Sequence, residues 1–249
     1  MQPIVLLTDF GNRDPYVASM KGVIAARCTA PIHDLSHDIA PHDVFEAAWF
    51  VHAVGTLWPE GTIFVCVVDP GVGTARRILA IESAGRIFLA PDNGLLSLMD
   101  AQSIVSVENE SFFLPNGSTT FHGRDRFAPV AAAIVNGAAI SDLGPNIDAI
   151  VRLDYTPPSY DAEPVLGRIV SVDRFGNAVT DVERARISFE SFALRVHYAT
   201  ISRMASAYEG REPFLIVGSS GTIEISVAGG SAADVLHLRR GDPVEIIRT

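Results

Sequence analysis

Residues 62–73 read Thr-Ile-Phe-Val-Cys-Val-Val-Asp-Pro-Gly-Val-Gly. The part from Thr62 to Asp69 is apolar at almost every position, which is typical of a strand that helices cover on both faces. Such a strand belongs to a parallel sheet, whose strands are joined by helical crossovers. The stretch therefore predicts an α/β layer domain in which a carboxylate and a glycine-rich loop follow a buried strand.

The sequence around this strand alternates between strand-like and helix-like segments. Short apolar runs predict strands, and apolar residues at helical spacing predict helices. The second of the predicted helices is expected to have its N-cap at His42 or Asp43. The strands are expected at Ile4–Thr8, Pro31–Ser36, Ile78–Glu82 and Ile87–Ala90, and the helices at Tyr16–Cys28, Asp43–Trp58 and Phe127–Asn136. Residues 1–155 thus read as an N-terminal three-layer α/β domain with a mostly parallel sheet.

The chain changes character after residue 155. Residues 156–164 form a proline-rich linker, and beyond it short strand-like runs alternate with turn signals. Strands are expected at Leu166–Val172, Ala193–Tyr198, Phe214–Gly218, Thr222–Val227 and Pro243–Ile247, and a helix at Ser231–Leu238. Residues 165–249 are therefore predicted to form a smaller C-terminal domain that is mainly β and barrel-like.

The composition narrows the partners and the compartment. The 249 residues carry a formal net charge of −10, which repels the phosphates of nucleic acid. No cluster of Lys and Arg favours a membrane surface, and no apolar run is long enough to span one. Cys28 and Cys66 lack zinc-site spacing and are expected to be buried, reduced thiols. We therefore expect a cytoplasmic protein that binds neither nucleic acid nor membrane.

Three polar segments in the first domain are candidates for chemistry. Asp9 follows the first strand, where open α/β sheets bind ligands, and its carboxylate can accept hydrogen bonds from both ribose hydroxyls. Asp69 and Arg76 flank a loop whose glycines let the backbone approach a ligand, and Arg76 can fold back to hold Asp69 ionised. His122 precedes a helix and is a natural proton carrier near neutral pH. A carboxylate, a guanidinium and an imidazole can together position and deprotonate water.

Each candidate also has a plainer interpretation. Asp9 is suited to a turn or helix cap, the Asp69–Arg76 pair to a structural salt bridge, and His122 to capping or packing. The glycine loop lacks the Gly-Lys-Ser/Thr signature of a P-loop. Between His33 and Asp43 several His and Asp residues suggest a metal site, but their spacing matches no helical ligand motif. We expect that segment to be a solvated loop.

The second domain has two comparable segments. Asp173 is suited to binding an ammonium group, Phe175 to stacking on a base and Asn177 to contacting an adenine edge. Val217–Glu224 places polar groups on either side of a strand start. Turn chemistry is the alternative explanation for both segments.

Taken together, these segments resemble the S-adenosylmethionine hydrolase family (SAM hydroxide adenosyltransferases), formerly a domain of unknown function and related to the fluorinase and chlorinase. The resemblance spans nearly the whole chain and rests on the order and spacing of its motifs. These are Thr8–Gly11, Lys21–Gly22, Ser36–Asp43, Pro59–Thr62, Val68–Gly73, Pro91–Leu96, Phe121–Asp125, Asp173–Asn177 and Ser219–Gly221.

The resemblance implies a function and an assembly. It implies cleavage of S-adenosyl-L-methionine by water at the ribose C5′, which gives adenosine and L-methionine without a metal or another cofactor; the (R)-sulfonium epimer is a candidate for the preferred substrate. It implies a homotrimer with active sites between the N-domain of one subunit and the C-domain of its neighbour. The catalytic residues would be Asp69, Arg76 and His122, and the substrate-binding residues Asp9, Asp14, Asp173, Phe175, Asn177, Ser219 and Glu224.

The halogenase relatives differ from this chain at the centre of the site. They carry an aromatic residue where this chain has Asp69, and an inserted loop that is not seen here. Because a carboxylate repels halide and accepts a hydrogen bond from water, water is the expected nucleophile. Val227–Gly229 departs from the Val-Asn expected in relatives. The alternatives are a SAM-dependent halogenase, a non-catalytic adenosine- or SAM-binding protein and, more remotely, a metal hydrolase.

Overall fold

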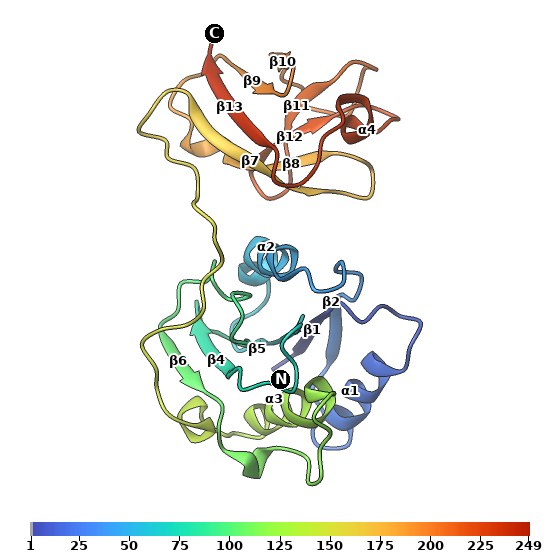
Figure 1. The fold of residues 1–249 in the computed structure, drawn as a ribbon, viewed down its shortest axis with the longest axis vertical. Helices are drawn as coiled ribbons and strands as arrows, with labels where there is room; N and C mark the ends of the chain where they lie inside the picture. Colours follow the sequence, from blue (N-terminus) through green and yellow to red (C-terminus); the bar gives the residue numbers. More distant parts are fainter. Residues whose placement is uncertain (1) are drawn as a thin grey trace. The chain divides into compact units, whose positions relative to one another are not determined.

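The computed structural model describes residues 2–249. The chain forms two compact units, one that ends at Asp154 and one that spans Tyr155–Thr249 (Figure 1). Within residues 2–249, no helix has the length and apolar character needed to cross a membrane.

The first unit is built on a sheet with the strand order β2-β1-β3-β5-β4-β6. The pairs β1–β2, β1–β3 and β3–β5 are parallel, and β4 is antiparallel to both β5 and β6. All strands of this described sheet except β4 therefore run in one direction, as expected of a mostly parallel sheet. The strands are β1 (Ile4–Thr8), β2 (Ile32–Ser36), β3 (Ile63–Val67), β4 (Ile78–Ser83), β5 (Arg86–Pro91) and β6 (Ser103–Ser106).

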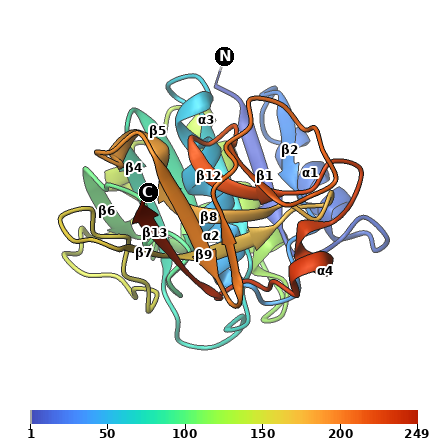
Figure 2. The ribbon, with the colours of Figure 1, turned by 90° about the horizontal axis from the view of Figure 1, so that it is seen from above.

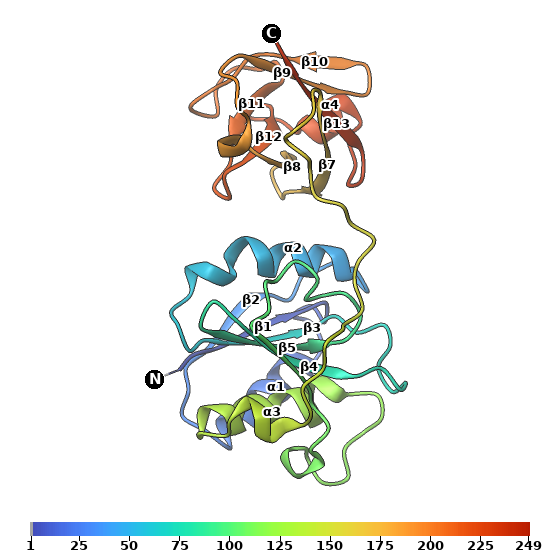
Figure 3. The same cartoon turned by 90° about the vertical axis from the view of Figure 1, so that its left-hand side faces the viewer.

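Helices cover both faces of this sheet, so the predicted three layers are confirmed. Helices α1 (Tyr16–Ala25) and α3 (Ala128–Val135) lie on one face, and α2 (Val44–Val54) lies on the other (Figure 3). Alternate residues of a strand enter opposite cores, because successive side chains point to opposite faces. In β3, Ile63, Val65 and Val67 pack with α1 and α3, and Phe64 and Cys66 pack with α2.

The predicted helices are somewhat longer than the observed ones, and one strand was not predicted. Helix α2 begins after Asp43, whose side chain accepts a hydrogen bond from Glu46 N at 2.9 Å, and after Val54 the chain tightens into a 3₁₀ turn at Gly55–Leu57. The segment Ser103–Ser106 has polar ends and only two apolar residues. Its pairing with β4 makes it a strand.

The second unit is the mainly β, barrel-like domain that the turn pattern predicted. Its sheet has the order β10-β9-β13-β7-β8-β12-β11 with antiparallel pairing, and the strands curve around a common core (Figure 2). The pattern missed β8 and β10, which are polar or very short. The elements are β7 (Val165–Val172), β8 (Ala178–Glu183), β9 (Phe192–Val196), β10 (Ala199–Ile201), β11 (Phe214–Val217), β12 (Thr222–Ser226), α4 (Ala232–Leu236) and β13 (Pro243–Arg248).

Candidate active site

The end of β3 carries a buried ion pair between Asp69 and Arg76. Nε of Arg76 donates to both carboxylate oxygens of Asp69 at 3.0 Å, and Nη2 donates to Oδ2. The two side chains are only 4% and 8% exposed, respectively. The loop between them folds back through turn hydrogen bonds, including Thr74 Oγ1 to Gly71 O at 2.7 Å. The return of Arg76 across the loop, expected from the sequence, is present.

His122 joins this pair from a different part of the chain. It immediately precedes a π-helical turn, Gly123–Phe127, that leads into α3, and Nη2 of Arg76 lies 2.7 Å from its Nδ1. The turn packs closely, since a Cβ on Gly123 would lie 3.1 Å from Sδ of Met20 in α1. π-helical turns inside helical segments are frequent at functional sites. The fold thus brings together Asp69, Arg76 and His122.

The protonation state of His122 follows from its partner. A guanidinium nitrogen can only donate, so Nδ1 of His122 accepts and the proton of the neutral imidazole resides on Nε2. Burial, together with the positive charges of Arg126 and Arg76, lowers the pKa of His122 to about 4. The nearby carboxylates act in the opposite direction but do not reverse the shift. His122 is therefore neutral at pH 7 and is a hydrogen-bond donor there, whereas the sequence suggested a proton carrier.

Two buried donors of this cluster have no hydrogen-bond partner in the described part of the chain. They are Nη1 of Arg76 and Nε2 of His122. A buried unsatisfied donor costs about 1–3 kcal/mol, so such atoms mark positions where a polar ligand or water belongs. The cluster therefore combines an acceptor, the Asp69 carboxylate, with two donors, and these groups suit a water molecule.

Asp9 lies at the same edge of the sheet. Thr8 pairs with Val67 in the parallel β1–β3 register, so Asp9 and Asp69 leave neighbouring strands at their carboxyl ends. The Asp9 side chain is 9% exposed, and its Oδ2 accepts a hydrogen bond from His42 N at 2.9 Å. Asp14 lies in the exposed loop before α1.

The His- and Asp-rich segment between His33 and Asp43 is in part the solvated loop expected there, since Asp38 and His42 are exposed, but it begins within strand β2 and contains a buried histidine. His37 is only 4% exposed and contacts the buried Thr8 hydroxyl. Among residues 2–249, no group of three or more His, Cys, Asp or Glu side chains is arranged to hold a metal ion. Cys28 and Cys66 are free thiols, as predicted, but only Cys66 is buried and Cys28 is partly exposed.

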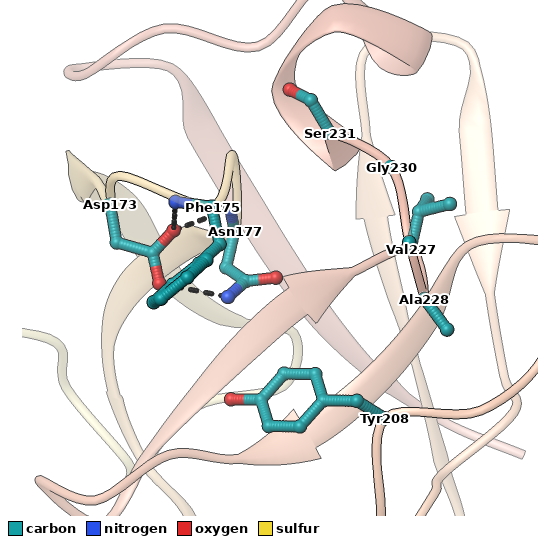
Figure 4. Close-up of a pocket in the computed structure, with 9 residues that line it drawn as sticks. Asp173, Phe175, Asn177, Tyr208, Val227, Ala228, Gly230 and Ser231 are labelled. Atoms are coloured by element: carbon teal, nitrogen blue, oxygen red, sulfur yellow. Dashed lines mark hydrogen bonds between the residues drawn. The ribbon is translucent and has the colours of Figure 1, made fainter.

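The second unit contains a cavity of about 620 Å³ (Figure 4). Figure 4 shows Asp173, Phe175 and Asn177 on one side of it and Val227, Ala228 and Ser231 on the other, with the Tyr208 ring between them. The rings of Phe175 and Tyr208 are 76% and 56% exposed. Aromatic faces of this kind suit a planar base. Tyr208 was not predicted, because it stands in a polar segment without a recognisable motif.

The other substrate-binding residues predicted in this unit, Asp173, Glu224 and Ser219, lie in three different surroundings. Asp173 Oδ1 accepts from the backbone of Phe175 and Asn177, each at 2.8 Å, and Oδ2 accepts from Asn177 Nδ2 at 2.8 Å. Glu224 is buried in β12, and burial, with a contribution from the Asp173 charge, raises the pKa of Glu224. Tyr208 OH lies 3.4 Å from Glu224 Oε2. Ser219 is exposed in the turn between β11 and β12 and does not line the cavity.

The chain combines an α/β unit and a barrel-like β unit, with a carboxylate–guanidinium–imidazole cluster at the carboxyl edge of the α/β sheet. The class of protein with these features is identified by comparison of the sequence with known families. The chain belongs to the SAM hydroxide adenosyltransferase family: residues 4–144 match the N-terminal domain and residues 167–245 the C-terminal domain of that family.

Individual relatives agree with this assignment. A protein of Thermus thermophilus named (R)-S-adenosyl-L-methionine hydrolase is 36% identical, and the match covers 99% of this chain and 100% of the relative. A crystal structure of an uncharacterized conserved protein from Thermotoga maritima superposes with a TM-score of 0.92 at 33% identity over 98% of this chain and 100% of the other. A fluorinase of an Actinoplanes species is more distant, at 25% identity over 98% of this chain and 97% of the relative.

Proposed function

We propose that this protein hydrolyses S-adenosyl-L-methionine to adenosine and L-methionine and prefers the (R)-sulfonium epimer. The observation that carries the proposal is the buried Asp69–Arg76–His122 cluster, which holds an acceptor and two unpartnered donors at the ligand-binding edge of the sheet. The Thermus relative, which matches over its full length, is named for this epimer of the substrate.

In the proposed reaction, water attacks the ribose C5′ on the side opposite the sulfonium. The Asp69 carboxylate accepts a hydrogen bond from the water, and either Nη1 of Arg76 or Nε2 of His122 donates to one lone pair of the water oxygen, which leaves the other lone pair free to attack C5′. Asp69 is the proton acceptor, because neutral His122 has its Nδ1 occupied by Arg76. The C5′–S bond breaks with its electron pair on sulfur, which leaves as the neutral thioether of methionine, and one proton is released.

The rate enhancement would come from alignment of the water with C5′ and from its removal from bulk solvent. Asp9 is proposed to accept hydrogen bonds from the ribose hydroxyls, and Asp14, in the loop before α1, is proposed to contact the adenine or methionine part of the substrate. The reaction needs neither a metal nor a redox group, because the sulfonium is already a good leaving group. Asp69 also disfavours a halide nucleophile by charge repulsion.

The cavity of the second unit is proposed to bind the remainder of the substrate. Phe175 and Tyr208 would stack on adenine and Asn177 would contact its edge, with Asp173 on the methionine side and Ser219 and Glu224 contributing from beside the cavity. We propose a homotrimer in which the first unit of one subunit and the second unit of its neighbour contribute to the same active site. The proposed compartment is the cytoplasm, in keeping with the two free thiols.

The test is a product assay with each sulfonium epimer supplied separately in water enriched in ¹⁸O. The proposal predicts adenosine with ¹⁸O in its 5′-hydroxyl, equal amounts of methionine, and faster turnover of the (R) epimer. Parallel reactions with added chelator or chloride test the metal-hydrolase and halogenase alternatives. Adenosine without the label, loss of turnover with chelator, or 5′-chloro-5′-deoxyadenosine as the main product would reject the proposal.

A further inference from the structure

The segment His37–His42 makes several hydrogen bonds to the backbone and side chain around Asp9. Gly11 N donates to His37 O at 2.8 Å, and His42 N donates to Asp9 Oδ2 at 2.9 Å. Phe10 N donates to Thr8 Oγ1 at 3.2 Å, and Thr8 Oγ1 lies 2.8 Å from Nδ1 of His37. The turn that carries Asp9 is therefore held to this segment by hydrogen bonds. Gly11 N and the Asp9 carboxylate bond to the segment directly, and Phe10 N is linked to it through the Thr8 hydroxyl.

The direction of the hydrogen bond between Thr8 and His37 follows from the group on the other side of the ring. Thr8 Oγ1 accepts from Phe10 N and has both a proton and a second lone pair available for Nδ1 of His37. The Asp34 carboxylate lies 3.0 Å from Nε2 and favours a ring proton there, so Nδ1 accepts the proton of the Thr8 hydroxyl. Thr8 is fully buried and His37 is 4% exposed, so neither group can exchange its partner for bulk water.

The other side of the His37 ring faces an ion pair. Nε2 lies 3.0 Å from Asp34 Oδ1, close but too bent for a well-aligned hydrogen bond, and Lys21 Nζ lies 2.6 Å from Asp34 Oδ2. Burial acts to raise the pKa of Asp34, but the contacts with Lys21 and His37 outweigh it and hold that pKa below its ordinary value. The ionised carboxylate favours the ring tautomer with its proton on Nε2.

We propose that His37 is a positioning residue that sets the recognition of the ribose by holding the Asp9 turn through the Thr8 hydroxyl. This inference rests on the proposed function, in which Asp9 accepts hydrogen bonds from the ribose hydroxyls. It also gives the His- and Asp-rich segment a role: its backbone and His37 orient a carboxylate at the edge of the sheet. Orientation matters because a carboxylate bonds both hydroxyls only if its two oxygens face them.

The experiment compares the binding of adenosine and 2′-deoxyadenosine to the full-length protein by calorimetry. Loss of one charge-assisted hydrogen bond is expected to weaken the binding of 2′-deoxyadenosine to the wild type about tenfold or more. His37→Leu, which fills the same space without polar atoms, is expected to reduce this discrimination to about that of Asp9→Asn. His37→Asn is expected to retain most of it, because its amide can replace Nδ1.

Combining the substitutions separates positioning from a general loss of structure. If His37 acts through Asp9, His37→Leu adds nothing to the discrimination of the Asp9→Asn variant in a double-mutant cycle. His33→Asn, in strand β2 just before His37 but against Trp58, is the matched control and should behave as the wild type. If His37→Leu does not fold, Thr8→Val with Thr8→Ser as its control tests the same hydrogen bond.

The outcomes are distinguishable. One outcome would overturn the positioning role of His37 but not the proposed function. In it, the wild type discriminates between the two nucleosides, and a folded His37→Leu or Thr8→Val variant discriminates equally well. A wild type that binds both nucleosides equally, or binds neither, would overturn the ribose role of Asp9 and the inference with it.

Discussion

The Asp69 cluster of the first unit and the cavity of the second unit each contain an aspartate that is bonded to its neighbours, but they leave different groups to meet a ligand. Asp69, Arg76 and His122 are buried and bonded to one another, and the unpartnered donors remain among them. In the cavity, the Asp173 carboxylate is bonded to its own turn, and the groups left to meet a ligand are the exposed rings of Phe175 and Tyr208.

This difference indicates a division of labour. Reaction chemistry needs polar groups whose positions are fixed before the substrate arrives, because reorganising them during the reaction raises the barrier. Binding of a base needs mainly apolar surface that the ligand then covers. Substitutions in the Asp69 cluster should therefore lower kcat, and substitutions in the cavity should raise KM.

The largest effect is expected from Arg76→Met. It leaves the Asp69 carboxylate buried without its partner, which costs about 3–5 kcal/mol for ion pairs of this kind. We expect turnover to fall by about two orders of magnitude or more, together with a clear loss of stability in chemical denaturation. Arg77→Met is the matched control: it breaks the neighbouring ion pair with Asp92 and should lower stability without comparable loss of kcat. Equal turnover in Arg76→Met and Arg77→Met would contradict the assignment of the reaction chemistry to the Asp69 cluster.

The pH dependence tests the state of His122. Because its pKa is lowered to about 4 from 6.5, the unfolded state binds a proton between these values that the folded state does not. The contribution of His122 to the free energy of unfolding is therefore fully present above about pH 6.5 and is lost as the pH falls toward 4. His122→Gln should flatten this part of the stability curve measured by denaturation.

In the wild type, turnover should show no ionisation of His122 between pH 6.5 and 8. A histidine titration near pH 7 in the NMR spectrum, absent from His122→Gln, would contradict the assignment.

In the second unit, Phe175→Ala is expected to raise KM about tenfold with little change in kcat. Stacking of a base on an aromatic ring contributes about 1–3 kcal/mol, and the ring is exposed, so its removal leaves the core intact. Steady-state kinetics and adenosine titration measure the two quantities. Tyr198→Ala, which also removes an exposed ring but one outside the cavity, is the control. A fall in kcat of the same size as the rise in KM would place Phe175 in the chemistry instead.

The smallest effect is expected from Ser219→Ala. The side chain is exposed and outside the cavity lining, and one neutral hydrogen bond contributes about 0.5–1.5 kcal/mol, so KM should rise by about threefold. Competition by methionine measures the change directly. An effect above about thirtyfold would show that this turn has a larger share in binding than one hydrogen bond explains.

The sequence predicts what depends on local pattern. The buried strand ending at Asp69 and the helix that begins after Asp43 follow from apolar spacing and capping chemistry, and the observed elements agree. Short strands such as β10 depend on partners far away in the chain and have no such signal. Asp69 and Arg76 are close in sequence, so their pairing could be expected from the loop.

The state of His122 could not be predicted in the same way. Its pKa depends on burial and on the positive charges of Arg126 and Arg76, which only the folded chain brings around the ring. Tyr208 likewise reaches the cavity through the fold of the second unit, without a motif of its own. The burial of His37 against Thr8 arises from the parallel pairing of β1 with β2.

The most direct test of the proposed chemistry is a single-turnover reaction with the Asp69→Ala variant and the (R) epimer, beside the wild type and Asp148→Ala, an exposed aspartate of the first unit. We expect formation of adenosine by Asp69→Ala to slow by about two orders of magnitude or more, while the Kd for the substrate stays within a few-fold of the wild type. Adenosine formation at the wild-type rate by a folded, substrate-binding Asp69→Ala protein would contradict the central role of this carboxylate.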